Sequence, residues 1–194
     1  MYYLDAKMYD KISKSVEIRS INSLGRKRLS KKDFDCGIDE YNSFLFDDAL
    51  SLDKKNISKT FLMIHIKTKT IVGYFSLATD NIKLTTDEKI NSKLEDVAFR
   101  SFPAIKLGKL AINKDIPNSI RIKGYGSFIL NIIDYYAYQV AEIGVGCRFI
   151  TVDADIEYDK DTDKFYLKNG FKYNENYKNV KSETISMRRD VYGI

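Results

Sequence analysis

The chain has 194 residues, of which 44% are apolar and 30% charged, so its composition is that of a soluble globular protein and excludes a disordered or fibrous one. Basic side chains outnumber acidic ones by 32 to 27, a moderate excess that excludes neither a nucleic-acid partner nor an ordinary solvated surface. No apolar run approaches a membrane span, and the charged N-terminal stretch lacks the apolar core of a signal peptide, so we expect a cytoplasmic protein with no membrane partner.

The first third of the chain predicts one strand and one helix. Residues 1–15 are a polar extension without a clear pattern, and we expect the folded domain to cover residues 16–194. Residues 16–21 alternate in hydrophobicity like a first strand. After the basic segment 25–32, residues 34–50 carry apolar side chains at helical spacing, which predicts an amphipathic helix (Tyr41, Phe44, Leu45 and Ala49).

The middle of the chain predicts a β meander. Residues 58–84 contain two β-rich runs separated by the polar link 67–70, which indicates a hairpin. Residues 85–100 are polar, with a short helix favoured after Thr86 because Asp87 and Glu88 suit a helix start. Residues 104–113 then predict another strand.

The last third alternates helices and strands. Apolar residues at helical spacing between 128 and 140 predict a helix that ends near Gly144 or Gly146. Residues 147–155 predict a buried strand, residues 159–171 a short helix with Gly170 at its C-terminal end, and residues 184–191 a closing strand. The order predicts a single domain of the α/β (α+β) class.

The stretch RIKGYG, residues 121–126, joins a strand to a helix through Gly124 and Gly126. A glycine-rich turn that opens a helix directs unpaired backbone N–H groups at one point, which suits a phosphate or pyrophosphate. A dinucleotide-binding fold needs a third glycine, but Ile129 occupies that position. The turn therefore predicts an anion site without predicting a dinucleotide fold.

Other catalytic chemistries find little support. The cysteines Cys36 and Cys147 and the single histidine, His65, are spaced for neither a disulfide framework nor a zinc site, and we expect no metal. A cysteine–histidine nucleophile pair stays formally open, although Cys147 and His65 lie in strand-like segments that favour structural roles. Neither a P-loop nor a G-x-S-x-G elbow occurs.

Two blocks of the sequence resemble one family. Arg121, Gly124 and Gly126 fit the pattern Arg/Gln-x-x-Gly-x-Gly/Ala, and KFYLKNGF, residues 164–171, is similar to a later block of the same family. On these residues the chain resembles the GNAT superfamily of N-acetyltransferases. FDCGIDEYNSFLFDDA, KTFLMI, IVGYFSLA and LGKLAIN resemble, in order, the branch that includes bacterial toxins acetylating aminoacyl-tRNA. The resemblance covers roughly residues 16–175.

The resemblance implies a fold and a coenzyme site. The expected fold is a GNAT-type domain with a mixed, mostly antiparallel central sheet, flanked by helices, and a splayed strand pair for acyl-coenzyme A. Acetyl-coenzyme A is the expected cosubstrate, its pantetheine arm lying against residues 107–112. The residues implied in coenzyme binding are the N–H donors for the oxyanion, Leu110, Ala111 and Ile112, and the pyrophosphate turn, Arg121, Ile122, Lys123, Gly124, Tyr125, Gly126 and Ser127.

The resemblance also implies that Tyr166 is the catalytic residue that protonates or hydrogen-bonds the leaving sulfur, while a packed helix tyrosine is the structural alternative. Residues 107–113 contain no carboxylate, so Asp153, Asp155 and Glu95 are the bases left open. At pH 7 an α-amine with a pKa near ~8 is neutral about a tenth of the time, and a lysine near ~10.4 about once in a few thousand. A missing base therefore favours an α-amine acceptor.

Three functions follow as hypotheses. The leading one is an N-acetyltransferase acting on a primary amine, with the α-amine of aminoacyl-tRNA as its toxin-like form, and Arg26, Lys27 and Arg28 as a candidate phosphate-binding patch. The others are an acetyltransferase for a small-molecule or protein amine, and a non-catalytic domain that binds acyl-coenzyme A or a partner. An antitoxin and a second copy of the chain stay open as further partners.

Overall fold

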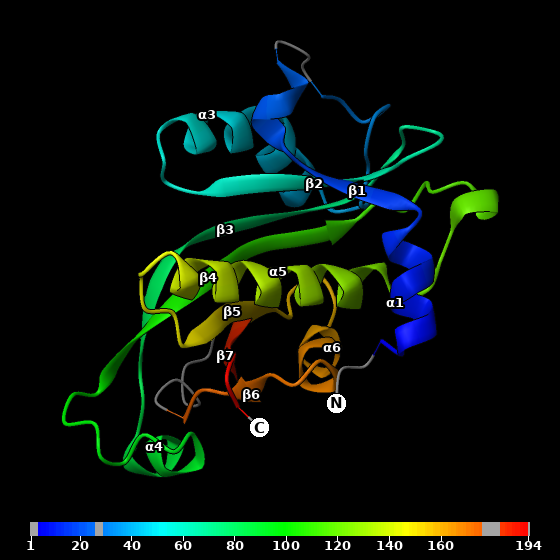
Figure 1. Cartoon of the computed structure of the whole chain (residues 1–194). Coiled ribbons are helices and arrows are strands. Elements are labelled where there is room, and N and C mark those ends of the chain that lie inside the picture. Colours follow the sequence, from blue (N-terminus) through cyan, green and yellow to red (C-terminus); the bar gives the residue numbers. More distant parts are fainter. Residues whose placement is uncertain (1–3, 26–28, 176–182, 194) are drawn as a thin grey trace. The chain divides into compact units, whose positions relative to one another are not determined.

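The computed structural model describes residues 4–25, 29–175 and 183–193 (Figure 1). Its elements in chain order are α1 (Ala6–Ser13), β1 (Val16–Ser20), the 3-10 helix η1 (Ile21–Leu24), α2 (Asp39–Ser43), the π-helical turn η2 (Phe44–Asp48), α3 (Ala49–Lys54), β2 (Lys59–His65), β3 (Ile71–Lys83), α4 (Thr86–Asn91), β4 (Ser101–Ile112), the 3-10 helix η3 (Asn118–Ile120), α5 (Tyr125–Glu142), β5 (Phe149–Asp155), α6 (Thr162–Lys168), β6 (Lys172–Tyr173) and β7 (Thr184–Asp190).

The strands form one seven-stranded sheet in the order β1-β2-β3-β4-β5-β7-β6. The pairs β1–β2, β2–β3, β5–β7 and β6–β7 are antiparallel, and β4–β5 is parallel. The prediction of a mixed, mostly antiparallel sheet flanked by helices is therefore confirmed. Within the described ranges, no helix combines the length and apolar character needed to cross a bilayer.

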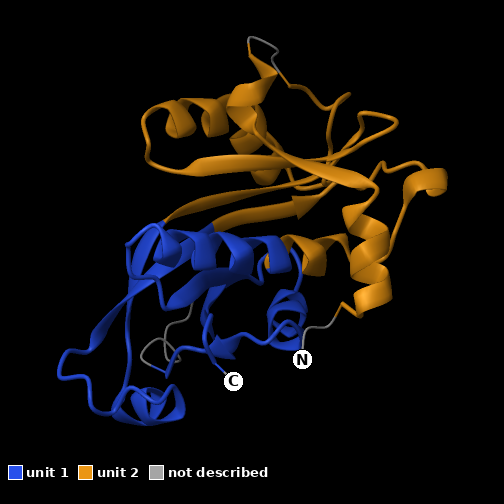
Figure 2. Ribbon diagram, viewed as in Figure 1, with its two compact units in different colours: residues 1–3, 79–107, 131–194 blue, residues 4–78, 108–130 orange. Residues whose placement is uncertain are grey.

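The chain divides into two compact units (Figure 2). Unit 1 comprises residues 1–3, 79–107 and 131–194, and unit 2 comprises residues 4–78 and 108–130. The strands β3 and β4 and the helix α5 each contribute residues to both units. We describe each unit by itself.

Unit 2 has a core of apolar side chains from η1, η2, α3 and the β2–β3 hairpin, in which Phe34, Leu62 and Tyr74 are almost wholly inaccessible to solvent. The single helix predicted over residues 34–50 is corrected here, because the helix begins only at Asp39 and passes through the π-helical turn η2. The preceding loop stays non-helical because Gly37 adopts a φ of +87°.

Unit 1 has a second core between β3, β4 and β5, built around Phe102 and Phe149. The predicted short helix after Thr86 is α4, and a capping box between Thr85 and Glu88 fixes its start. Glu88 also forms a buried ion pair with Arg188 of β7, at 2.6 Å. The helices predicted near residues 128–140 and 159–171 correspond to α5 and α6, whereas the sequence did not predict the two-residue strand β6.

Candidate functional site

The glycine turn lies in unit 2 and leads directly into α5. Gly124 has a φ of +108°, a left-handed conformation that residues with a side chain rarely adopt, and α5 begins at Tyr125. The first N–H groups of an α-helix have no partner within the helix and lie at the positive end of its dipole. Gly126 and Ser127, in this first turn, are only partly buried. The turn thus has the backbone geometry that an anion site needs.

Two side chains of the predicted coenzyme set hold the turn in place. Tyr125 is buried, and its hydroxyl donates a hydrogen bond to the carbonyl oxygen of Ile120 at 2.6 Å. The Arg121 guanidinium donates to the carbonyl oxygens of Ile116, at 2.8 Å, and Lys114, at 2.9 Å. Both side chains therefore tie the turn to the loop before it, and a contact from Tyr125 to an anion would have to come from its backbone N–H. Lys123 and Arg121 are exposed, and Ile122 is partly buried.

The N-terminal segment, for which the sequence predicted no structure, packs on the turn. A β-carbon added to Gly124 would lie 2.6 Å from Cδ1 of Leu4, 3.8 Å from Cδ1 of Ile12 and 3.9 Å from Cγ of Met8. Position 124 therefore requires glycine both for its conformation and for space. The missed signal was the spacing of these three apolar residues, four apart, which is the period of one helix face.

The predicted oxyanion donors, residues 110–112, lie at the end of β4 in unit 2. Just before them, the Lys109 N–H donates to the hydroxyl of Ser76 at 3.0 Å. Just after them, the Asn113 N–H donates to the carbonyl oxygen of Val72 at 2.9 Å. The neighbouring strand β3 thus fixes the backbone on both sides of the donor segment. Ala111 is buried, and Leu110 and Ile112 are partly buried.

Gly73 and Ser76 of β3 are site-supporting residues that the sequence reasoning missed. A β-carbon on Gly73 would lie 2.8 Å from the carbonyl oxygen of Ala111, so only glycine permits this approach of β3 to β4. An isolated glycine inside a strand pattern often marks such a close approach of two backbones, and this was the available signal. Nothing in the sequence signalled Ser76.

Tyr166 lies on α6, in unit 1, and is only 6% exposed. The rings of Phe165 and Phe171 pack edge-on against it, with centroid distances of 5.1 and 5.2 Å. Among the described residues its hydroxyl has no hydrogen-bond partner. Burial, with a smaller contribution from the negative charge of Asp155, raises the pKa of the phenol far above its ordinary value. Tyr166 is therefore a neutral hydrogen-bond donor at physiological pH.

The three carboxylates left open as bases, all in unit 1, differ in their surroundings. Asp153 forms an ion pair with Lys106 at 2.6 Å, joining β5 to β4. Asp155 accepts a hydrogen bond from the N–H of Glu157 at 3.1 Å. Glu95 is exposed in the loop after α4.

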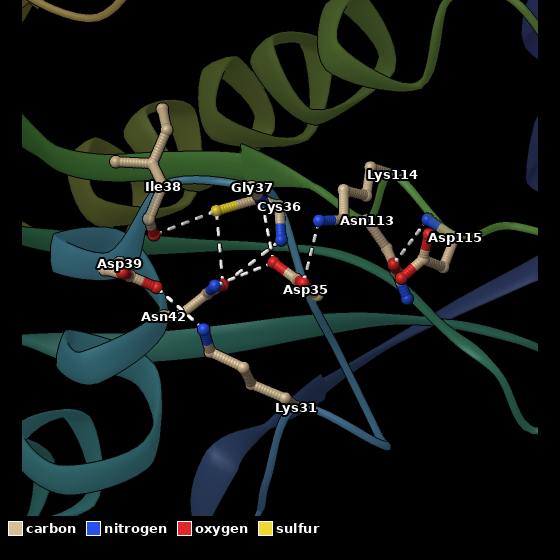
Figure 3. A network of polar contacts seen from close by, with 10 residues as sticks. All are labelled: Lys31, Asp35, Cys36, Gly37, Ile38, Asp39, Asn42, Asn113, Lys114 and Asp115. Atoms are coloured by element: carbon tan, nitrogen blue, oxygen red, sulfur yellow. Dashed lines mark hydrogen bonds and ion pairs between the residues drawn. The ribbon is translucent and has the colours of Figure 1, made fainter.

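A polar network in unit 2 joins the loop before α2 to the residues that follow β4 (Figure 3). The Asp35 carboxylate accepts hydrogen bonds from Lys114 at 2.9 Å, from the Asn42 amide at 2.8 Å and from the Gly37 N–H at 2.7 Å. These donors, Lys114 first, hold the pKa of the Asp35 carboxyl far below its usual range. The network fixes the loop against the end of β4.

The same network engages Cys36, whose thiol and backbone N–H both donate to the side-chain oxygen of Asn42. Burial raises the pKa of the Cys36 thiol, which disfavours the reactive thiolate. The imidazole of His65 instead contacts the hydroxyl of Thr68 at 2.9 Å. No hydrogen bond joins a thiol to this imidazole in the described part of the chain, so the geometry gives no support to a cysteine–histidine nucleophile.

The predicted basic patch, Arg26, Lys27 and Arg28, lies outside the described residues. Further along the same segment, Lys31 forms an exposed ion pair with Asp39 at 2.8 Å. The turn 121–127 and the donor segment 110–112 thus both belong to unit 2, and Tyr166 belongs to unit 1.

No family model matches the chain. Solved structures do match its fold. A tyrosine-to-phenylalanine mutant of KacT is 19% identical, with a TM-score of 0.70 over 91% of this chain and 95% of that one. AtaT complexed with acetyl-methionyl-tRNAfMet is 18% identical, with a TM-score of 0.67 over 89% and 93%. A tyrosine-to-phenylalanine mutant of the AtaT toxin, bound to acetyl-CoA and the C-terminus of the antitoxin AtaR, is 18% identical, with a TM-score of 0.65 over 91% and 94%. The predicted resemblance to the GNAT fold of such toxins is confirmed.

Proposed function

We propose that the chain is an acetyl-coenzyme A-dependent N-acetyltransferase. The observation that carries the proposal is the turn at residues 121–127, where a left-handed glycine, the first N–H groups of a helix and the exposed Lys123 suit a pyrophosphate. AtaT, which has the same fold, has been solved with acetyl-CoA bound. The residues present thus fit the coenzyme.

The proposed reaction is direct attack of a neutral primary amine on the thioester carbonyl. The C–N bond forms and the C–S bond breaks, the amine loses a proton to water, and the released thiolate takes up a proton from water. Backbone N–H groups of residues 110–112 stabilise the developing oxyanion, as the fixed ends of that segment allow. Amides held rigidly in advance need no reorganisation during the reaction.

Tyr166 acts in this proposal as a hydrogen-bond donor to the leaving sulfur. Its raised pKa favours hydrogen bonding over proton transfer, because a phenol with a raised pKa gives up its proton less readily to a thiolate with a pKa near ~8.5. Its hydroxyl has no acceptor among the described residues, so donating to a ligand breaks no existing bond. Hydrogen bonds to charged groups contribute about 1.5–3 kcal/mol.

The proposed acceptor is the α-amine of an aminoacyl-tRNA. Two considerations support it: the donor strand lacks a carboxylate base, which favours an amine that is partly neutral at pH 7, and AtaT has been solved with acetyl-methionyl-tRNAfMet. In this proposal the protein works in the cytoplasm. An antitoxin is proposed as a partner by analogy with AtaR bound to AtaT, and a homodimer stays a prediction.

The test is transfer of labelled acetyl from acetyl-coenzyme A to bulk charged tRNA, with deacylated tRNA and Tyr166→Phe as controls. We expect label on charged tRNA only, strongly reduced in the Tyr166→Phe variant. Label on small amines or peptides but not on tRNA would instead support an acetyltransferase for a small-molecule or protein amine. Binding of acetyl-coenzyme A without thiol release for any acceptor would favour the non-catalytic domain.

The basic patch is tested separately by replacing Arg26, Lys27 and Arg28 with glutamine. If these residues contact tRNA phosphates, transfer should weaken and its dependence on salt should flatten by roughly one power of salt concentration per lost contact. Unchanged transfer and an unchanged salt slope would remove the patch from the proposal. Transfer to a small amine should not respond.

The coenzyme site is tested with two glycines of similar conformation. Gly124→Ala introduces both strain and a collision with Leu4, whereas Gly144→Ala, at a φ of +97°, meets nothing within 4 Å. Both should lose about 1–2 kcal/mol of stability from strain, but only Gly124→Ala should lose about 1–3 kcal/mol more and bind acetyl-coenzyme A weakly, as measured by calorimetry. Adding Leu4→Ala should remove the collision but not the strain, so the loss should fall toward that of Gly144→Ala. Normal coenzyme binding by Gly124→Ala would place the pyrophosphate elsewhere.

A further inference from the structure

The helix that carries Tyr166 ends against a buried ion pair in unit 1. Arg189 of β7 pairs with Asp134 of α5, and both side chains are less than a tenth exposed, at 7% and 9%. One oxygen of Asp134 has no hydrogen-bond partner among the described residues. Apolar residues of similar volume often replace a buried ion pair without loss of stability, so stability alone does not explain this pair.

Arg189 connects this pair to the residues that follow Tyr166. Its Nη1 donates to the carbonyl oxygen of Asn169 at 2.9 Å, and its guanidinium lies 4.8 Å from the ring centroid of Phe171. The backbone N–H groups of Asn169 and Phe171 both donate to the carbonyl oxygen of Tyr166, at 2.9 and 3.1 Å. The Phe171 ring also packs on the Tyr166 ring. Arg189 therefore reaches Tyr166 through both its backbone and its ring.

The position of Arg189 is itself fixed. It pairs with Ile150 in the β5–β7 register, so its backbone belongs to the sheet. Asp134 holds the other end of the guanidinium, and a planar guanidinium with several donors in fixed directions transmits that position better than an ammonium does. The Tyr166 hydroxyl makes no hydrogen bond to the described residues that would set the direction of its ring.

We propose that Asp134 and Arg189 are positioning residues that set the orientation of the Tyr166 hydroxyl for the acyl transfer. The inference rests on the proposed function, because it assigns a purpose to the orientation of Tyr166. The pair acts on Tyr166 through packing and main-chain hydrogen bonds, and it contacts neither acetyl-coenzyme A nor the acceptor amine.

The chain contains a matched control for the test. Arg188, the neighbouring residue on β7, forms a buried ion pair with Glu88 at 2.6 Å. Successive residues of a strand face opposite sides of the sheet, and Arg188 contacts the carbonyl oxygen of Tyr173 and the side chain of Asn174. The two pairs therefore share burial and chemistry, but only Arg189 contacts residues that bond directly to Tyr166. Arg188 is linked to α6 at its first turn, where the Tyr173 hydroxyl donates to Asp163.

The experiment compares two paired substitutions, each of which removes both charges so that no buried charge is left alone. The test variant is Asp134→Leu with Arg189→Met, and the control is Glu88→Leu with Arg188→Met. The first readout needs no acceptor: fluorine NMR of the full chain carrying fluorotyrosine, in which Tyr166→Phe identifies the Tyr166 resonance among the 14 tyrosines. We expect the test variant to shift or broaden that resonance, and the control variant to leave it unchanged.

The second readout is the kinetics of acetyl transfer. The test variant should lower kcat on the order of tenfold to a hundredfold, the cost of a small misplacement of a reacting group, while the KM for acetyl-coenzyme A stays unchanged. In a Tyr166→Phe background the same substitutions should cost nothing further. Arg189→Lys keeps the positive charge but loses the planar guanidinium with its several donors, so it should give an intermediate kcat.

Outcomes separate the two proposals. An unchanged Tyr166 resonance in a folded test variant overturns the positioning role, as does a kcat loss that adds in full to that of Tyr166→Phe. A wild-type rate in Tyr166→Phe itself overturns the proposed role of Tyr166, whatever the resonance shows. If the test variant does not fold, Arg189→Lys carries both readouts, and an unchanged resonance with an unchanged kcat overturns the inference.

Discussion

Two buried tyrosines, one in each unit, have rings in similar surroundings but hydroxyls in different ones. Tyr74 of unit 2 is fully buried between aromatic rings, and its hydroxyl donates to the carbonyl oxygen of Tyr41 at 2.8 Å. Tyr166 of unit 1 is also buried between aromatic rings, but its hydroxyl has no acceptor among the described residues. Burial of the ring alone therefore does not mark a functional tyrosine, whereas a hydroxyl that makes no internal hydrogen bond can donate to a ligand without breaking one.

The largest expected effect is that of Tyr166→Phe on the rate. Loss of a hydrogen bond to a developing thiolate should lower kcat by about tenfold to a hundredfold, with acetyl-coenzyme A affinity unchanged. Since no internal hydrogen bond is lost, the free energy of unfolding should stay within about 0.5 kcal/mol of the wild type. Transfer kinetics and urea unfolding measure the two quantities, and a strong loss of stability would place Tyr166 in the same class as Tyr74.

Tyr74→Phe should show the opposite pattern. It removes the hydrogen bond to the Tyr41 carbonyl oxygen and leaves that carbonyl without this donor, so unfolding should become easier by about 1–2 kcal/mol. Because Tyr74 takes no part in the proposed reaction, kcat should not change. The same two measurements apply, and a stability equal to that of the wild type would mean that the hydrogen bond contributes nothing net.

At alkaline pH, Tyr74 and Tyr166 should affect the free energy of unfolding in the same way. Burial is the main cause that raises the pKa of each phenol, so the unfolded chain loses these protons at lower pH than the folded chain does. Their contribution to stability is fully present below the unfolded pKa near ~10 and is lost as pH rises from there toward the folded pKa. Unfolding followed between pH ~8 and ~11 should show a loss that either Tyr→Phe variant makes less steep, and equal slopes in all three proteins would contradict the raised pKa values.

The smallest expected effect concerns the loop before α2, which contains Asp35. This loop leads to Tyr41, whose carbonyl oxygen accepts the Tyr74 hydrogen bond. Lys114→Met removes the donor with the largest effect on Asp35, so the pKa of that carboxyl should rise toward its ordinary value. Carboxyl carbon shifts followed from pH ~2 to ~6 would measure it. Because Phe34 and Phe44 still pack on Tyr74, the Tyr74 hydrogen bond should survive, and Lys114→Gln should behave in the same way. If Lys114→Met made unfolding easier by as much as Tyr74→Phe does, the loop would depend on this single ion pair.

How far the sequence predicted the molecule depended on how local each signal was. The glycine turn, the β2–β3 hairpin and the start of α4 follow from nearby residues, Gly124 and Thr85 among them, and were predicted. The late start of α2 was missed, although Gly37 at a φ of +87° and the hydrogen bond from its N–H to the Asp35 carboxylate are local features. The Asn42 side chain, which accepts from the Cys36 N–H six residues away, gave no such local signal.

The candidate site divides in the same way. The residues of the turn follow a spacing that the sequence displays, although the turning of the Tyr125 side chain into the protein could not be read from it. Asp134 and Arg189 are 55 residues apart, and nothing near either one signals the other. Ser76 of β3, which accepts from the Lys109 N–H of the neighbouring strand β4, could not be predicted for the same reason.

The packing of Leu4, Met8 and Ile12 on Gly124 has a practical consequence for anyone who handles this protein. A chain shortened to begin at residue 16, where the sequence suggests the domain starts, would lose the side chains that fill the space beside this glycine. The newly bared apolar surface would favour self-association, and the turn would gain freedom that binding must then remove. Affinity tags and trimming are for this reason safer away from the first helix.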